Sequence, residues 1–225
     1  MNSGPFDPSF DDLPERISIF PLSGVLLLPR GRLPLNVFEP RYLAMVRDAL
    51  AKPLRLIGMV QPREDEGHGA GIIAGEPAVY ATGCAGRIVS FAETGDGRYL
   101  IELRGVARFA VAAEPPRPSP YRIVAADWSR YRGDLVETPQ FVDRERLLKA
   151  LKPYLDQCNI HADWRALEAL ADDRLVTSVA MLAPLAPQEK QALLEAADTG
   201  ARAALVAGLL EMAVRANAGP PTQVN

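Results

Sequence analysis

The sequence predicts an α+β fold in which a strand-rich first part precedes a helical second part. Up to about residue 132, apolar residues occur in short runs that proline or glycine interrupts, which is typical of strands. From about residue 133 the apolar spacing becomes that of amphipathic helices. Because helices follow the strands instead of alternating with them, we expect no βαβ connections.

The composition is that of a globular protein with a sizeable core. Of 225 residues, 48% are hydrophobic and 24% charged, and the net charge is -3. An acidic balance gives no overall attraction to nucleic acid. The start lacks a signal-peptide pattern, and no apolar stretch approaches the roughly 20 residues of a membrane span. We therefore expect a cytoplasmic protein without nucleic acid or membrane partners.

The first part begins with a polar, proline-containing lead-in over residues 1–15, which we expect to be flexible. Turn signals then separate short extended runs. Thr94-Gly95-Asp96-Gly97 is the clearest of them, because glycine reaches the positive φ that a tight hairpin needs. Such a series predicts a closed or half-closed barrel. The predicted strands cover residues 17–20, 25–28, 33–37, 56–60, 78–93, 99–112 and 121–128.

One short helix is predicted within the strand-rich part, over residues 40–50. Pro40 suits the first helical position, and Glu39 places negative charge near the positive helix end. Phe38 and Tyr42 flank this entry. We expect both to be buried and to anchor the helix to the barrel.

The helical part is predicted to extend over residues 133–217, with a frayed tail over 218–225. Asp163 is a candidate N-cap for a helix that carries Trp164, which we expect to be mostly buried. Pro153 should kink or end its own helix, since proline lacks the N–H that a helix interior requires. Pro187 should open a further helix.

Several motifs occur in order along the chain and together resemble the amino-terminal substrate-binding domain of Lon proteases over about residues 16–212. The motifs are Ile19-Phe20-Pro21-Leu22, Val25-Leu26-Leu27-Leu28-Pro29, Leu33-Pro34-Leu35-Asn36-Val37-Phe38-Glu39-Pro40-Arg41-Tyr42, Gly83-Cys84-Ala85-Gly86-Arg87-Ile88, Gly105-Val106-Ala107-Arg108-Phe109 and Glu189-Lys190-Gln191-Ala192-Leu193-Leu194-Glu195.

The resemblance implies a PUA-like β pseudo-barrel over residues 16–132, followed by a C-terminal helical bundle over 133–217. It also implies capture of unfolded or exposed polypeptide segments, in connection with a protease partner. The sequence has no GxxxxGK[ST] phosphate loop, so we expect a stand-alone, non-catalytic module without a cofactor.

Five residues are candidates for partner binding. Arg41 and Tyr42 either face a partner or only fix the helix start. Arg87, Phe91 and Tyr99 flank the predicted hairpin, where they are either cross-strand packing or an exposed aromatic patch.

Two other functions remain as alternatives. The PUA-like resemblance admits an RNA-binding or small-ligand-binding module. A cysteine-dependent hydrolase would use Cys84 with His68 or His161 and Asp163, although Cys84 lies in a predicted strand where a half-buried thiol is common. We expect no metal site, because four suitable ligands do not cluster in the sequence.

Overall fold

The computed structural model describes residues 8–63, 77–116, 119–136 and 138–217. These residues form two compact units. Unit 1 contains the residues up to Thr138 together with Leu185–Leu194, and unit 2 contains Pro139–Pro184 and the residues from Glu195 onward. The apolar spacing of Leu185–Leu194 is that of a helix, so the sequence had placed this segment in the helical part. In the structure it belongs to the unit that holds the strands.

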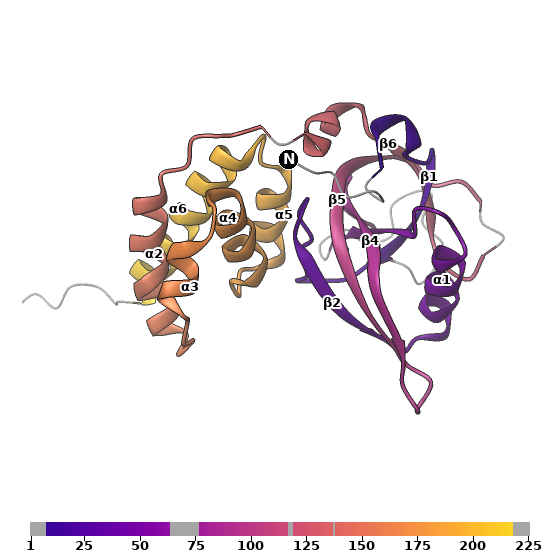
Figure 1. Cartoon of the computed structure of the whole chain (residues 1–225), viewed down its shortest axis with the longest axis horizontal. Coiled ribbons are helices and arrows are strands. Elements are labelled where there is room, and N and C mark those ends of the chain that lie inside the picture. Colours follow the sequence, from indigo (N-terminus) through magenta and orange to yellow (C-terminus); the bar gives the residue numbers. More distant parts are fainter. Residues whose placement is uncertain (1–7, 64–76, 117–118, 137, 218–225) are drawn as a thin grey trace, which may run out of the picture. The chain divides into compact units, whose positions relative to one another are not determined.

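Unit 1 is built on one six-stranded sheet in the order β2-β5-β4-β3-β1-β6 (Figure 1). Alternating and short apolar runs form these strands, with β4 and β5 far longer than the others. The strands are β1 (Arg16–Pro21), β2 (Arg32–Val37), β3 (Leu56–Val60), β4 (Thr82–Glu93), β5 (Tyr99–Ala113) and β6 (Ile123–Asp127).

The sheet is mixed, which confirms an α+β fold. β6 pairs with β1 and also with the end of β5, so the sheet curves, while in the described part β2 pairs with β5 alone. It is not a closed barrel. β1 and β3 are parallel and the chain between them includes α1 (Pro40–Leu50), so the expected absence of βαβ connections is wrong for this pair. The PUA-like label and the helical bundle stay predictions.

Residues 8–15, expected to belong to a flexible lead-in, contain the 3-10 helix η1 (Phe10–Asp12). The indole nitrogen of Trp128 donates to the carbonyl of Pro14 at 2.9 Å. This contact ties the segment to the core around Phe109 and Trp128, whose ring centroids lie 5.4 Å apart.

The predicted strand over residues 25–28 is wrong. Leu26, Leu27 and Leu28 are buried, but the segment is irregular and pairs with no strand. It crosses β5 at Gly105, where a Cβ atom would lie 1.9 Å from the oxygen of Leu28. Only glycine permits this close approach. The apolar run over residues 25–28 therefore reflects burial in the core and not membership of the sheet.

Helix α1 begins as predicted, with Glu39 at the N-cap and Pro40 at the first position. Tyr42 is buried, and its ring centroid lies 4.1 Å from that of Phe20 on β1. The expectation for Phe38 is wrong, because its side chain is 61% exposed. Tyr42 alone of the two therefore anchors the helix.

Helix α5 (Pro187–Glu195) is held on the strands of unit 1 by buried polar groups. Lys190 Nζ donates to the oxygen of Gly24 at 2.8 Å, and Gln191 Nε2 to the oxygen of Thr82 at 3.2 Å. Gln61 Nε2 donates to the oxygen of Pro187 at 2.8 Å. Each of these hydrogen bonds satisfies a main-chain carbonyl that would otherwise be costly to bury.

Arg108 on β5 completes the attachment of α5. Its guanidinium binds both carboxylate oxygens of Asp134 at 2.8–2.9 Å and the carbonyl of Leu194 at 3.0 Å. Burial alone would lower the pKa of Arg108, but hydrogen bonding and the charge of Asp134 raise it overall. Asp134 lies in the 3-10 helix η2 (Ser129–Leu135).

Unit 2 is helical in its described residues. Asp163 caps its helix by accepting from the N–H of Ala166, as predicted, and Trp164 is mostly but not fully buried. The helix that contains Pro153 continues through it to Gln157, so of the two expected effects, a kink or an end of the helix, the end is excluded. The helices are α2 (Arg144–Gln157), α3 (Trp164–Ala169), α4 (Asp172–Leu182) and α6 (Thr199–Asn217).

Candidate functional site

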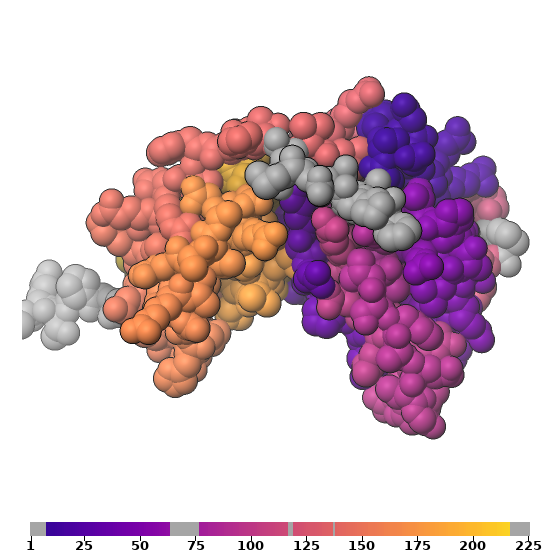
Figure 2. Space-filling model, viewed as in Figure 1, coloured from indigo at the N-terminus to yellow at the C-terminus, as the bar shows by residue number. Residues whose placement is uncertain are grey.

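The β4–β5 hairpin projects from the sheet of unit 1, as Figure 2 shows for residues near 95. Its turn is closed by the N–H of Gly97, which donates to the oxygen of Thr94 at 3.0 Å, and Gly97 has a φ of 79°. The predicted turn at Thr94–Gly97 is thus confirmed. Along this hairpin, Val89–Glu93 of β4 are exposed, whereas Tyr99 and Ile101 of β5 are buried.

Two of the predicted partner-binding residues meet on this hairpin. The rings of Phe91 and Tyr99 are 5.0 Å apart in an edge-to-face arrangement. Phe91 is 43% exposed, whereas Tyr99 is 8% exposed. Phe91 is therefore accessible to a partner, and Tyr99 supports it from the core.

Three further apolar residues are exposed at or beside the hairpin, and we did not single them out as partner-binding candidates from the sequence. Phe38 is 61%, Leu100 45% and Val89 40% exposed. Val89 is the extra residue of a bulge in β4, and Leu100 points away from the core in the alternation of β5. We call Phe38, Val89, Phe91 and Leu100 the hairpin surface, which extends over both faces: Phe91 shares the face of Tyr99 and Ile101, and Leu100 lies on the opposite face. Strict alternation along residues 99–104 was the only sequence signal for Leu100.

Arg41 and Tyr42 lie elsewhere, at the start of α1. Arg41 binds Glu39 through Nε at 3.0 Å and stacks on the Tyr42 ring, with 4.5 Å between its central carbon and the ring centroid. The residues line a small cleft of about 110 Å³. The other lining residues are Pro21, Pro62, Pro77, Tyr121 and Arg122.

Most polar groups of this small cleft already serve the fold. Arg122 makes a bidentate pair with Glu114 at 2.6–2.8 Å and donates to the oxygen of Pro77 at 2.8 Å. The hydroxyl of Tyr121 donates to Asp48 at 2.6 Å. Burial, and then the hydrogen bond and charge of Asp48, raise the pKa of Tyr121. The cleft is therefore a structural network first.

Arg87, the remaining predicted residue, lies half-buried in β4. Its cross-strand partners are Leu56 on β3 and Arg104 on β5. The structure thus places the five predicted residues in three places: Phe91 and Tyr99 on the hairpin, Arg41 and Tyr42 at α1, and Arg87 within the sheet.

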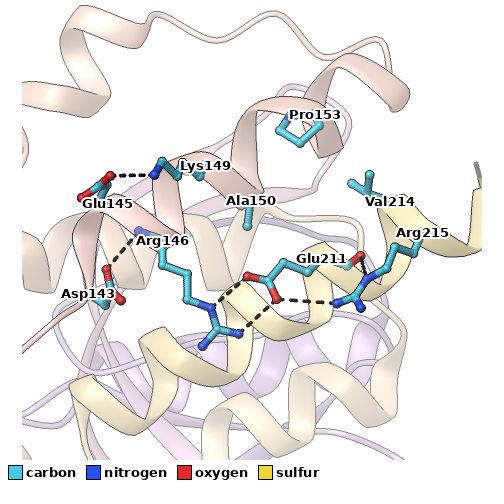
Figure 3. A pocket seen from close by; sticks show the side chains of 9 residues that line it. All are labelled: Asp143, Glu145, Arg146, Lys149, Ala150, Pro153, Glu211, Val214 and Arg215. Carbon is cyan, nitrogen blue, oxygen red and sulfur yellow. Dashed lines mark hydrogen bonds and ion pairs between the residues drawn. The ribbon is translucent and has the colours of Figure 1, made fainter.

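Unit 2 has a larger cleft, of about 540 Å³, between α2 and α6 (Figure 3). Glu211 binds Arg146 through both carboxylate oxygens at 2.8 and 3.0 Å and lies 3.7 Å from Arg215. The hydrogen bond from Arg146 lowers the pKa of Glu211. Lys149 pairs with Glu145 at 2.6 Å. Because acids and bases balance along this wall, the cleft favours neither anions nor cations.

The hydrolase alternative finds little support in the geometry. Cys84 is fully buried in β4, and its sulfur donates to the oxygen of Ala85 at 3.7 Å, so no substrate reaches it. His68 lies outside the described residues, as does the glycine-rich loop over 67–75. His161 is exposed before Asp163, which caps α3. Within the described ranges, no group of three or more His, Cys, Asp or Glu residues could hold a metal ion.

The family model of the ATP-dependent protease La (LON) substrate-binding domain matches residues 16–212. The chain belongs to this family.

Relatives of this LON substrate-binding domain are much longer proteins. "Lon protease 2" of Myxococcus xanthus is 28% identical over 89% of this chain and 24% of its own length. "Lon protease 2" of Sorangium cellulosum is 31% identical over 92% of this chain and 25% of its own length. The chain spans about a quarter of the length of the curated relatives it matches.

Solved structures of Lon N-terminal domains share the fold. A Lon N-terminal domain protein from Xanthomonas campestris is 26% identical, covers 83% of this chain and 94% of its own, and has a TM-score of 0.56. The N-terminal domain of the Mycobacterium avium complex Lon protease is 16% identical, covers 87% and 97%, and has a TM-score of 0.61. The second shows the fold alone.

Among the described residues, no helix combines the length and apolar character needed to cross a bilayer.

Proposed function

We propose that the chain recognises polypeptide substrates for proteolysis through the hairpin surface. The observation that carries this proposal is the exposure of four large apolar side chains, Phe38, Val89, Phe91 and Leu100, which lie on the two faces of the projecting hairpin or beside it. Clustered exposed apolar side chains mark interaction sites in soluble proteins. Membership of a family described as substrate-binding supports the same role.

Binding on this surface is passive and needs no catalytic residue, cofactor or metal. An unfolded client exposes apolar segments that its folded form buries, so the hairpin surface discriminates between the two forms. Ordering a flexible segment opposes binding, which keeps the affinity of each contact low. A protease partner would then degrade the client. The relatives that the chain matches are themselves named Lon protease.

Side chains, and not edge hydrogen bonds, supply most of the affinity. The edge strand β2 has Pro34 at its centre, opposite Glu102 of β5. Proline has no N–H, and in an edge strand its nitrogen faces away from the neighbouring strand, toward the open edge. An incoming strand would therefore lose a hydrogen bond in the middle of β2, which disfavours strand addition there.

Titration of a permanently unfolded, labelled client and its folded counterpart tests the proposal. We expect saturable, reversible binding of the unfolded client only. It should survive high salt, because burial of apolar surface is not screened. Failure to bind either form, together with tight binding of a defined RNA or a small metabolite, would contradict it.

A further inference from the structure

The part of β4 next to the hairpin turn has no strand on its outer side. β3 pairs with β4 as far as Arg87, and the N–H of Ile88 then donates to the oxygen of Arg55 at 3.0 Å. In the described part of the chain, no strand follows on this side, so β4 continues with β5 as its one neighbour. A bulge, which is a common way to end strand pairing, marks this point. We call Val89–Glu93 of β4 the open edge.

The register of the sheet shows which residues of β5 bond to which neighbouring strand. In antiparallel pairing, successive residues turn their N–H and C=O alternately to the two sides of a strand. The N–H of Gly105 donates to the oxygen of Gly31 at 2.8 Å, on the side of β2. The register with β2 is unbroken from there to Tyr99, so Ile101 and Tyr99 also turn toward β2, and Leu100 turns toward β4.

The same alternation turns the main chain of Phe91 and Glu93 toward the open edge. Leu100 is the cross-strand partner of Ala92, so these two residues bond to each other between β5 and β4. Phe91 and Glu93, on either side of Ala92, then present their N–H and C=O to the side without a strand. Donors and acceptors alternate there, in the pattern that the main chain of another extended segment complements.

The open edge lacks the protection that the edge strand β2 has. β2 carries Pro34 at its centre, and proline and lysine are common means by which edge strands avoid pairing with other chains. Residues 89–93 read Val-Ser-Phe-Ala-Glu, without proline or lysine, and all five are exposed. Strand addition is therefore disfavoured at β2 and favoured at β4.

We infer that the open edge binds an extended client segment as an added strand. The inference rests on the proposed function and names the form in which a client is recognised. Hydrogen bonds to the main chain of Phe91 and Glu93 set the direction and register of the segment, while side chains of the hairpin surface contribute apolar contact. A client side chain opposite Phe91 joins the face of Tyr99 and Ile101, so an aromatic or β-branched residue is favoured there.

A polypeptide fits the open edge better than a nucleic acid does. The carbonyl groups of Phe91 and Glu93 need donors, and a phosphate group supplies only acceptors. The carboxylate of Glu93 also repels phosphates. An added strand supplies both donors and acceptors at the spacing of β4 itself.

N-methylated peptides test the inference by fluorescence anisotropy. The probe is a short labelled peptide of Val and Thr with a central Phe, and two further versions carry N-methyl groups on one or the other alternate set of residues. An added strand bonds through one set only. One methylated version should therefore bind about fivefold or more weakly than the probe, and the other within about twofold of it. Equal affinities of the two versions would overturn the inference and leave polypeptide binding intact, whereas failure of all three to bind would count against the proposed function too.

Two variants at Glu93 test the same edge from the side of the protein. Both remove the carboxylate, but Glu93→Pro also removes the N–H, which faces the open edge, so the hydrogen bonds between β4 and β5 remain. Glu93→Pro should bind the unmethylated probe about threefold or more weakly than Glu93→Ala. Equal binding by the two folded variants would overturn the inference, and if Glu93→Pro does not fold, the methylated peptides decide. Dimerisation of the wild type that the probe does not reverse, measured by sedimentation, would assign the open edge to a second copy and overturn the inference as well.

Discussion

Lys190 Nζ donates a hydrogen bond to the main-chain oxygen of Gly24 at 2.8 Å, although 166 residues separate the two. Lys190 is only 8% exposed. The contact belongs to the polar network that holds α5 on the strands of unit 1. Unit 1 is therefore completed by a helix from near the carboxyl end of the described chain.

The first prediction concerns this contact. Lys190→Ala should lower the free energy of unfolding by about 1–3 kcal/mol, because the carbonyl of Gly24 loses its donor in a partly buried place. Urea titration measures the loss. Lys152→Ala, at an exposed position of α2, is the matched control and should change stability by less than about 0.5 kcal/mol. Equal effects of the two variants would contradict the role given to Lys190.

The second prediction concerns pH. Burial lowers the pKa of Lys190 below its usual 10.5. Between the lowered pKa and the ordinary one, the unfolded chain binds this proton more strongly than the folded chain does, so stability from this group increases as the pH rises. The stability of the wild type relative to Lys190→Met should therefore increase as the pH rises through the alkaline range toward 10.5. A constant difference across that range would show that the pKa is not lowered.

The third prediction contrasts two arginine pairs. Arg108→Met leaves the carboxylate of Asp134 buried without its cation and should destabilise the protein by about 3–5 kcal/mol. Arg146→Met breaks a more exposed pair with Glu211 and should destabilise the protein far less than Arg108→Met does, because solvent screens the pair. Denaturant melts of both variants check the order. A larger loss for Arg146→Met would be inconsistent with the burial of the two pairs.

The fourth prediction concerns Phe38, which is exposed where the sequence had suggested burial. Phe38→Ala should change stability by less than about 0.5 kcal/mol, as surface substitutions do. Phe109→Ala should destabilise by about 3–5 kcal/mol, because the Phe109 ring is fully buried in the core of unit 1. Thermal and urea unfolding compare the two, and a large loss for Phe38→Ala would mean that its ring packs on the core.

Elements with local signals could be predicted from the sequence. The turn at Thr94–Gly97, the start of α1 at Glu39-Pro40 and the cap at Asp163 each depend on residues a few positions apart. The chemistry of turns and caps is short-ranged, so the sequence contains it directly.

Features that depend on distant contacts could not be predicted. Leu26–Leu28 are as apolar as a strand, but they form none, and the main chain at Leu28 crosses β5 in close approach to Gly105. The return of α5 to unit 1 depends on Gly24, Thr82 and Pro187, which no local pattern connects. Of the candidate site, Phe91 was named from the sequence, whereas the exposure of Phe38 and Leu100 required the fold.

The most direct test of the central claim is the affinity of an unfolded, labelled client for a variant with Phe38→Ala, Phe91→Ala and Leu100→Ala combined. The account predicts a loss of affinity of about tenfold or more, since each buried large side chain contributes on the order of 1 kcal/mol or more to binding. Met212→Ala, at a position of unit 2 that is 63% exposed, is the control and should bind as the wild type does. Unchanged affinity of the folded triple variant would contradict polypeptide recognition by the hairpin surface.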